Sequence, residues 1–168
     1  MKPPKEKKEV ILVSACLVGI NCRYNGSSQR HPGVMAFLEG RSFVPVCPEV
    51  LSGLPMPRPP AEIQDGDGLQ VLLGKAKLHL RDGTDVTKAF RRGCEEALKV
   101  ARLVKPSMAI LKDRSPSCGI MQIYNDSKLI SGMGIFAVML ERDGIILKSE
   151  KEFPMPKDEK EVRAGKAL

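Results

Sequence analysis

Three short apolar runs limit what this chain can fold into. The first, residues 10–16, is Val-Ile-Leu-Val-Ser-Ala-Cys and is rich in β-branched side chains. This composition is typical of a strand buried on both faces, as in a parallel sheet. The runs at 42–47 and 108–112 have the same character, although Pro45 places the earlier one at a sheet edge or a bulge. The sequence therefore predicts a sheet that contains these three strands.

Helical patterns separate these runs. The clearest covers residues 85–104, where apolar side chains recur near the 3.6-residue helical period and Asp85 offers a cap. The pattern also predicts helices at 31–40 and 132–140, a strand at 145–148, a small hairpin of 69–73 with 77–81, and a stiff extended loop in the second half of 48–60. Strands that alternate with helices favour a three-layer α/β fold, Rossmann-like or flavodoxin-like, with a mostly parallel sheet and helices on both faces.

The length of 168 residues suits one domain with its own core. We expect a single α/β domain over 10–150, a charged N-terminal tail over 1–9 and a charged C-terminal tail over 151–168. No apolar run approaches the ~20 residues that a membrane-crossing helix needs, and no cleavage pattern of a signal peptide follows the charged start. The expectation is a cytoplasmic protein; the oligomeric state is left open.

The net charge of +7 raises the question of nucleic-acid binding. A local excess of positive charge falls on the predicted helix at 85–104 and just after it, at Lys88, Arg91, Arg92, Lys99, Arg102 and Lys105. Aromatic residues are 4% of the chain and tryptophan is absent, so stacking platforms for single strands are scarce. A solvated basic surface is the simpler interpretation, and a thiolated-RNA-binding protein is kept as an alternative.

The five cysteines carry the chemistry. Their number is odd and no Cys-x-x-Cys pair occurs, which excludes zinc ribbons, thioredoxin-type dithiols and the contiguous ferredoxin motif. Cys16 ends the first predicted strand, Cys47 ends the second, and Cys118 lies in the loop after the third. The carboxyl ends of parallel strands lie at one edge of a sheet, where α/β proteins bind ligands. We therefore expect these three thiols to converge on one site.

The other two cysteines have different expected places. Cys94 lies on the apolar stripe of the predicted helix at 85–104, where a buried core thiol is the ordinary explanation. Cys22 follows Cys16 by six residues in the same loop. It could be a fourth ligand, a resolving thiol in a redox enzyme that uses Cys16, or a bystander.

Three thiolates suit two kinds of metal centre. A [4Fe–4S] cluster held by three cysteines exposes one iron that can bind a substrate atom, and zinc with three cysteines and a water is the competitor. Glu49 and Ser115 stand two and three residues from expected ligands. Glu49 could transfer protons or form a surface salt bridge, and Ser115 could bind a developing anion or cap a helix that begins there.

Six segments together resemble the thiouracil desulfidase family, an iron–sulfur family long known only as a domain of unknown function. The matching segments are Ser14-Ala-Cys-Leu-x-Gly19, Cys22-Arg-Tyr-x-Gly26, Pro45-Val-Cys-Pro-Glu49, Gly53-Leu-Pro-x-Pro-Arg-Pro-Pro-Ala-Glu-Ile63, Asp85-Val-Thr87 and Ser115-Pro-Ser-Cys-Gly119. They occur in the family's order and span about 10–150. Each segment alone would be a weak signal, but the set is highly specific.

The resemblance implies a cofactor, a reaction and roles for five residues. Cys16, Cys47 and Cys118 match the family's ligands of a [4Fe–4S] cluster whose fourth iron has no protein ligand. In the family, the sulfur of a thiolated uracil binds that iron, water replaces the sulfur without net redox change, and the sulfur leaves as hydrosulfide. Glu49 and Ser115 match the proposed acid–base and positioning residues.

The leading hypothesis is therefore an iron–sulfur-dependent, non-redox desulfidase for a thiolated pyrimidine base or nucleoside. A non-catalytic metal or iron–sulfur binding module is the alternative that keeps the cysteines but gives Glu49 no task. The expected partner is a small thiolated molecule, and no membrane association is expected.

Overall fold

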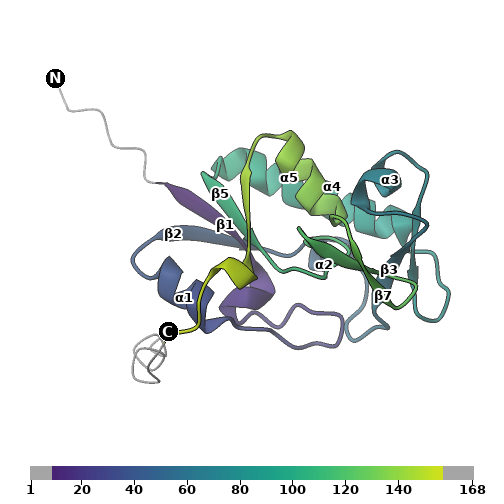
Figure 1. Cartoon of the computed structure of the whole chain (residues 1–168), viewed down its shortest axis with the longest axis horizontal. Helices are drawn as coiled ribbons and strands as arrows, with labels where there is room; N and C mark the ends of the chain where they lie inside the picture. The colour runs from purple at the N-terminus through teal and green to yellow at the C-terminus, as the bar shows by residue number, and fades with distance from the viewer. Residues whose placement is uncertain (1–8, 157–168) are drawn as a thin grey trace.

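A four-stranded parallel sheet forms the centre of the computed structural model, which describes residues 9–156 (Figure 1). The strand order is β2-β1-β5-β8, and every neighbouring pair is parallel. The strands are β1 (Val10–Ser14), β2 (Ser42–Val46), β5 (Met108–Leu111) and β8 (Ile146–Ser149). The three predicted strands are thus confirmed as neighbours, and the strand expected at 145–148 is confirmed one residue later.

Pro45 lies in the edge strand β2, where it pairs with Val13 of β1. An edge strand needs backbone donors on one side only, so a proline is tolerated there. On the other side of β1, Val13 pairs with Ile110 of β5. This register aligns the carboxyl ends of β1, β2 and β5 at one edge of the sheet.

Alternate residues of β1 face two separate cores. Leu12 packs in the core that contains α4 (Thr87–Val104) and α5 (Ile135–Arg142). Ile11 and Val13 pack in a second core with η1 (Ala15–Val18) and α1 (Pro32–Leu38). The two cores lie on opposite faces of the sheet because successive side chains of a strand point in opposite directions. This arrangement confirms the predicted three-layer α/β fold.

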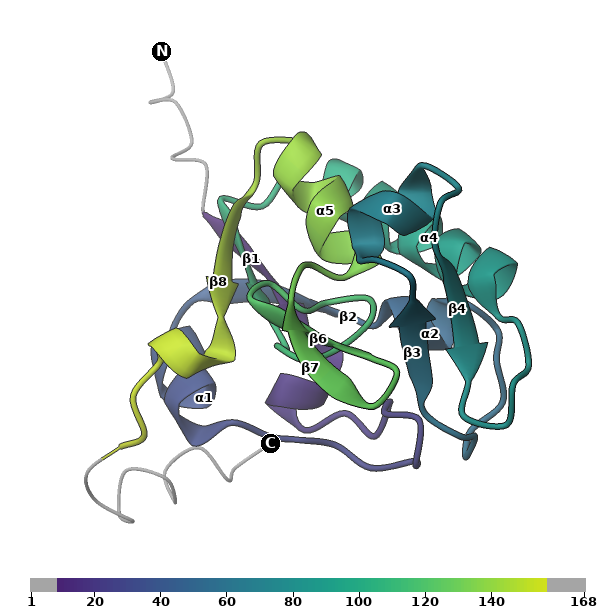
Figure 2. The same cartoon turned by 45° about the vertical axis from the view of Figure 1, so that its right-hand side comes forward.

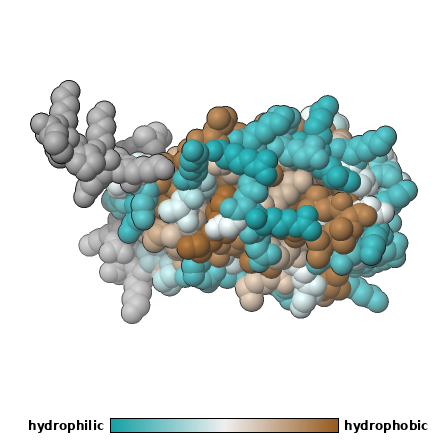
Figure 3. All heavy atoms as spheres, turned by 90° about the horizontal axis from the view of Figure 1, so that it is seen from above, coloured by the Kyte–Doolittle hydropathy of each residue, from teal (hydrophilic) through white to brown (hydrophobic). Residues whose placement is uncertain are grey.

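The helix predicted at 85–104 is confirmed, and its basic face is partly neutralised. Helix α4 begins at Thr87, whose backbone N–H donates to Asp85 Oδ1 at 2.9 Å. Lys99 pairs with Glu96 at 2.7 Å, and Arg102 pairs with Asp143 at 2.7 Å. The view from above shows hydrophilic side chains with apolar ones between them (Figure 3). Nucleic-acid binding by this face stays a prediction.

The hairpin expected from 69–73 and 77–81 is wrong. Residues of its first half form helix α3 (Gly68–Leu72), because Asp67 and Gln70 make a reciprocal capping box that starts a helix. Strand β4 (Lys77–Leu80) instead pairs antiparallel with β3 (Ala61–Gln64). The partner strand follows a proline-rich segment, so no local turn signal reveals the pairing.

Two further elements were not anticipated. A hairpin of β6 (Gln122–Asn125) with β7 (Lys128–Ser131) follows the loop after β5. A short helix α2 (Pro48–Leu51) follows β2 directly, and the extended loop comes only after it. The β3–β4 pair and the β6–β7 hairpin lie beside the parallel sheet, next to each other (Figure 2).

The chain continues to pack on the domain after β8. The 3-10 helix η2 (Glu150–Glu152) follows it, and the Phe153 ring lies 4.9 Å from the Phe37 ring of α1. The domain bounds of 10–150 stay a prediction, and residues 150–153 pack against the same domain. Most of the two expected tails, 1–9 and 151–168, lies outside the described residues. Among residues 9–156, no helix is long and apolar enough to cross a membrane.

Helix α2 lies directly against α4 at Gly93. A Cβ atom at this position would collide with the carbonyl oxygen of Pro48 and would lie 2.6 Å from the backbone nitrogen of Ser52. Both colliding groups are backbone atoms and cannot rotate away. The absence of a side chain at Gly93 therefore sets how closely α2, and Glu49 within it, can approach the core.

We expect Gly93→Ala to destabilise the protein by about 1–3 kcal/mol, the usual cost of overpacking. This loss would occur although alanine favours a helix over glycine by ~1 kcal/mol. Chemical denaturation measures the free energy of unfolding. The matched change Leu103→Ala, on the same helix at an 82% exposed position, should have little effect. A Gly93→Ala variant as stable as the unmodified protein would contradict the close approach.

Candidate functional site

Three strand ends bring three cysteines to one pocket. Cys16 lies in η1 directly after β1, Cys47 precedes α2 directly after β2, and Cys118 lies in the loop after β5. All three line a cavity of about 450 Å³. The structure therefore brings the three cysteines to one cavity, as predicted from the sequence. From β1 the chain continues to β2 on one side and later to β5 on the other side, so the strand order reverses at β1. The cavity lies at this point, which is the usual ligand position in such folds.

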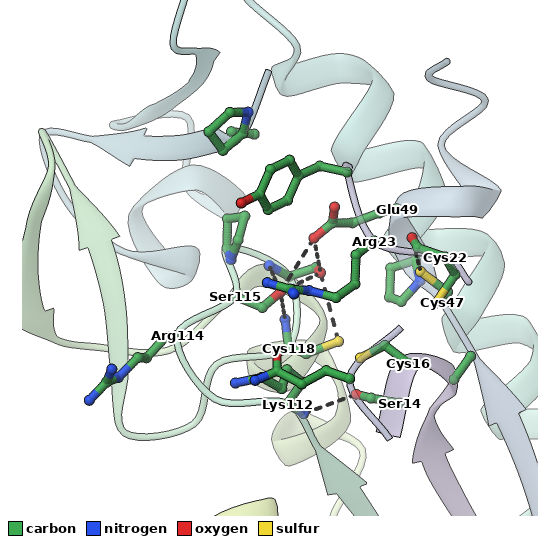
Figure 4. Close-up of a pocket in the computed structure, with 18 of the residues that line it drawn as sticks. Ser14, Cys16, Cys22, Arg23, Cys47, Glu49, Lys112, Arg114, Ser115 and Cys118 are labelled. Atoms are coloured by element: carbon green, nitrogen blue, oxygen red, sulfur yellow. Dashed lines mark hydrogen bonds between the residues drawn. The ribbon is translucent and has the colours of Figure 1, made fainter. Parts of the chain in front are cut away.

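Cys22 lines the same pocket and is 3% exposed. Figure 4 shows the sulfur atoms of Cys16, Cys22, Cys47 and Cys118 directed into one region. Cys47 Sγ also donates to the backbone oxygen of Cys22 at 3.7 Å. Hydrogen bonding to Cys22 lowers the pKa of Cys16 and of Cys47, and the same bonds raise the pKa of Cys22. Cys22 is thus a neighbour of two expected ligands, and its role stays open.

Cys94 is fully buried in the core around α4, as predicted. Burial raises the pKa of its thiol. Burial likewise raises the pKa of Cys118, whose sulfur accepts a hydrogen bond from Ser117 Oγ at 3.7 Å. The two buried thiols differ in position, because Cys118 lines the cavity and Cys94 does not.

Glu49 projects from α2 toward the loop that carries Cys118. Its Oε1 accepts hydrogen bonds from the hydroxyls of Ser115 and Ser117, both at 3.4 Å. Its Oε2 forms an ion pair with Arg58, which is 7% exposed. Burial raises the pKa of Glu49, and the opposing effects of Arg58 and the two hydroxyls are smaller. The exposed surface salt bridge considered for Glu49 is replaced by a buried pair inside the site.

Ser115 does not start a helix, because residues 116–118, which follow it, form a turn. Its Oγ nevertheless accepts the backbone N–H groups of Ser117 at 3.2 Å and Cys118 at 3.1 Å. These bonds resemble those of a helix cap, but no helix follows, so the helix-cap interpretation of Ser115 is wrong. Its role at the site stays a prediction. The hydroxyl fixes the backbone of Cys118 while it also contacts Glu49.

Sequence reasoning gave no role to several residues of the site. Ser117 contacts both Glu49 and Cys118, and Arg58 neutralises Glu49. Further residues that line the cavity are Arg23, Tyr24, Arg81, Lys112, Arg114 and Tyr124. Arg58 and Ser117 fall inside the quoted motifs, and an arginine flanked by prolines was the signal that could have been followed.

The donor set at the cavity consists of thiols. Thiolates suit an iron–sulfur cluster, and zinc with three cysteines and a water is the alternative with the same ligands. In a [4Fe–4S] cluster each cysteine binds a different iron, so cysteines from three separate strand ends can supply the ligands. Among residues 9–156, no three or more His, Cys, Asp or Glu side chains are arranged to hold one metal ion.

One carboxylate closes the loop that carries Ser115 and Cys118. Asp113 is 1% exposed, and its Oδ1 accepts backbone N–H groups at both Met121 and Gln122, at 3.1 and 3.2 Å. Burial alone raises its pKa, but Lys151 and the backbone donors outweigh burial and lower the pKa to about 2. The loop is therefore held at its base by an ionised side chain.

A family model described as 2-thiouracil desulfurase matches residues 11–152. The chain belongs to this family. An uncharacterized protein of Bacillus subtilis (strain 168), YbbK, is 42% identical over 146 residues, which cover 85% of this chain and 97% of the relative. The 2-thiouracil desulfurase family is one of desulfidase-type enzymes, in agreement with the predicted enzyme.

A solved structure of the [4Fe–4S]-dependent thiouracil desulfidase TudS is similar to this chain with a TM-score of 0.73. The two sequences are 40% identical, and the match covers 86% of this chain and 93% of that chain. The likeness confirms the predicted fold class and supports a [4Fe–4S] cluster as the cofactor in this member of the 2-thiouracil desulfurase family.

Iron content tests which thiols hold the cofactor. We expect Cys16→Ser, Cys47→Ser and Cys118→Ser each to lower bound iron well below the roughly four atoms per chain of a reconstituted cluster. Cys94→Ala should leave the iron content unchanged, since Cys94 lies outside the cavity. Cys22→Ser should also keep its iron if three thiols suffice. A loss in Cys22→Ser equal to the other three would make Cys22 a fourth ligand.

The charge on Asp113 predicts a pH-dependent stability. The pKa of Asp113 in the folded protein is lowered to about 2. Its contribution to the free energy of unfolding is therefore present above its pKa in the unfolded chain, ~3.9, and is lost as the pH falls through 2. Asp113→Asn should cost on the order of 2 kcal/mol at pH 7, and the difference from the unmodified protein should vanish near pH 2. Denaturation of the cluster-free protein at each pH measures this, with Asp143→Asn, from a solvent-exposed pair, as the control.

Proposed function

We propose that this protein removes sulfur from a thiolated pyrimidine, either a thiouracil-like base or its nucleoside. In this reaction a thiocarbonyl and water become a carbonyl and hydrosulfide. The carbon–sulfur bond breaks, a carbon–oxygen bond forms, and no electrons are gained or lost overall. Membership of the 2-thiouracil desulfurase family supports the substrate class.

The observation that carries this proposal is the meeting of three thiols with an acid–base pair in one cavity. Cys16, Cys47 and Cys118 come from three strand ends, and Glu49 and Ser115 line the same space. A module that only stored metal would not need a buried carboxylate with two hydroxyl donors. Cys16, Cys47 and Cys118 would hold the cluster, which when bound supplies a Lewis-acidic iron that accepts sulfur.

Glu49 is the proposed acid–base residue. Its Oε1 faces the hydroxyls of Ser115 and Ser117, while Arg58 binds the other oxygen. The ion pair fixes the carboxylate so that Oε1 is the atom presented to the cavity. We propose that Oε1 accepts a proton from the water that attacks the substrate carbon, and that Ser115 Oγ orients the water or the substrate oxygen.

Positive groups at the cavity wall suit a reaction in which negative charge develops on the substrate. Arg23 and Lys112 line the cavity together with Tyr24 and Tyr124, and Lys112 is already paired with Glu150. Fixed cations near a developing anion stabilise it without the reorganisation that water would need. The two tyrosines offer flat surfaces against which a pyrimidine ring can lie.

A reducing compartment suits this site. All five cysteines are free thiols, and four of them line one cavity. Such an arrangement survives in a cytosol kept reduced and would oxidise readily elsewhere. We propose that the protein acts in the cytoplasm.

The decisive experiment is anaerobic reconstitution with iron and sulfide, followed by an assay for hydrosulfide release from thiouracil. The expected result is a brown protein that forms uracil and hydrosulfide in equal amounts without an added electron donor. Protein that carries the cluster but releases no sulfur would favour the non-catalytic binding module. A requirement for an electron donor would contradict the non-redox reaction.

Glu49→Gln should lower the rate of sulfur release by about 10²–10⁴-fold, the usual contribution of a general acid–base residue. Glutamine keeps the shape of the side chain and its hydrogen-bonding oxygen, so iron content and substrate binding should change little. Steady-state assays of hydrosulfide with parallel iron analysis separate these effects. Equal turnover in Glu49→Gln and the unmodified enzyme would remove Glu49 from the mechanism.

A further inference from the structure

The loop after β5 is closed by a buried carboxylate that takes no part in the chemistry proposed above. Asp113 precedes the turns that carry Ser115 and Cys118, and its side chain is 0% exposed. Its Oδ1 accepts three consecutive backbone N–H groups, from Ile120, Met121 and Gln122, at 3.1–3.2 Å. One oxygen thus joins the two ends of the segment 114–119.

The same carboxylate connects the loop to the segment after β8. Its Oδ2 accepts from Lys151 Nζ at 2.6 Å, and its backbone N–H donates to Glu150 Oε2 at 2.8 Å. Lys112 Nζ binds Glu150 Oε1 at 2.8 Å. We call these four residues, Lys112, Asp113, Glu150 and Lys151, the carboxylate clamp. Alternating charges and backbone donors satisfy both acids, so neither is left unpaired in the interior.

The position of Cys118 depends on this closure. Within the loop, the backbone N–H of Gly119 donates to Ser115 O at 2.9 Å, and that of Cys118 donates to Ser115 Oγ at 3.1 Å. These bonds lie within residues 115–119. The carbonyl oxygens of Pro116, Ser117 and Gly119 attach this unit to the start of α5 by accepting backbone N–H groups of residues 134–137. Asp113 and the amides of 120–122 make the second attachment, to the end of β5 and the segment after β8. Loss of the clamp would therefore leave the loop that carries Cys118 and Ser115 held from the α5 side alone.

We propose that Asp113 is a positioning residue for the cofactor, and that the carboxylate clamp makes retention of the cluster depend on the segment after β8. The inference rests on the proposed function, since it takes Cys118 as a ligand. Side chains that orient metal ligands from outside change metal affinity or activity by about 10–100-fold when they are removed. The effect is expected on iron retention first, because Asp113 contacts none of the reacting groups.

The test compares reconstituted protein in which the clamp is weakened at either end. Asp113→Ala removes both sets of bonds, and Lys151→Met removes only the charged partner, while Lys151→Arg should restore it. We expect Asp113→Ala to release iron to a chelator about 10–100-fold faster than the unmodified protein. Lys151→Met should show a smaller increase, and Lys151→Arg should be close to the unmodified protein.

A second measurement does not require the cluster. Hydrogen exchange at the amides of 117–122 should accelerate in Asp113→Ala, with the core helix α4 unchanged. Asp143→Asn is the matched control, because Asp143 pairs with Arg102 on the surface away from the cavity. It should alter neither iron release nor exchange in the loop.

The outcomes separate the clamp from the proposed function. Iron release from Asp113→Ala at the rate of the unmodified protein would overturn the positioning role. Equal acceleration in α4 and in the loop would also overturn it, because it would mean general destabilisation. An unmodified protein that never binds iron would count against the proposed function, while hydrogen exchange would still decide whether Asp113 holds the loop.

Discussion

Parallel pairing of β1, β2 and β5 is the constraint on which the rest of this structure depends. Parallel strands all end at the same edge, so residues far apart in the chain meet there without any local motif. Each of the three strands is followed at once by a different structure: a 3-10 turn, a short helix and a hydrogen-bonded loop. Cys16 and Cys47 come directly after their strands, and a folded loop returns Cys118 to the same edge, so three unrelated segments make a three-thiol site.

Burial and charge are balanced around this site in two ways. Glu49 lies among hydroxyls and one arginine, and burial still raises its pKa. Asp113 lies among backbone donors and a lysine, and its pKa is lowered. The pKa values of two buried carboxyl groups are thereby shifted in opposite directions, and Asp113 is the one held ionised as part of the framework. Different environments commonly divide acid–base and structural tasks between like residues.

Much of this arrangement follows from local sequence, and the remainder depends on contacts between distant segments. The apolar runs predicted the sheet strands, and their ends predicted the meeting of Cys16, Cys47 and Cys118. The pairing of β3 with β4 was not predicted, because helix α3 rather than a short turn connects the two strands. The position of Cys22 at the cavity was left open, because a loop of six residues can fold in many ways. Its closure here uses Gly19 with a φ of 97° and backbone bonds from later residues. Local patterns cannot report such contacts.

The β3–β4 pair and the β6–β7 hairpin form a part of the cavity wall that carries none of the thiols. Ala61, Glu62 and Tyr124 line the cavity from β3 and β6, whereas the thiols come from the ends of the parallel sheet. β3 pairs with β4 and β6 with β7, and neither pair joins the parallel sheet. Their link to the thiol framework runs through Gln122 at the start of β6, whose backbone N–H donates to Asp113. Changes beyond Gln122 can therefore reshape this part of the cavity wall while the strands that carry the thiols keep their pairing.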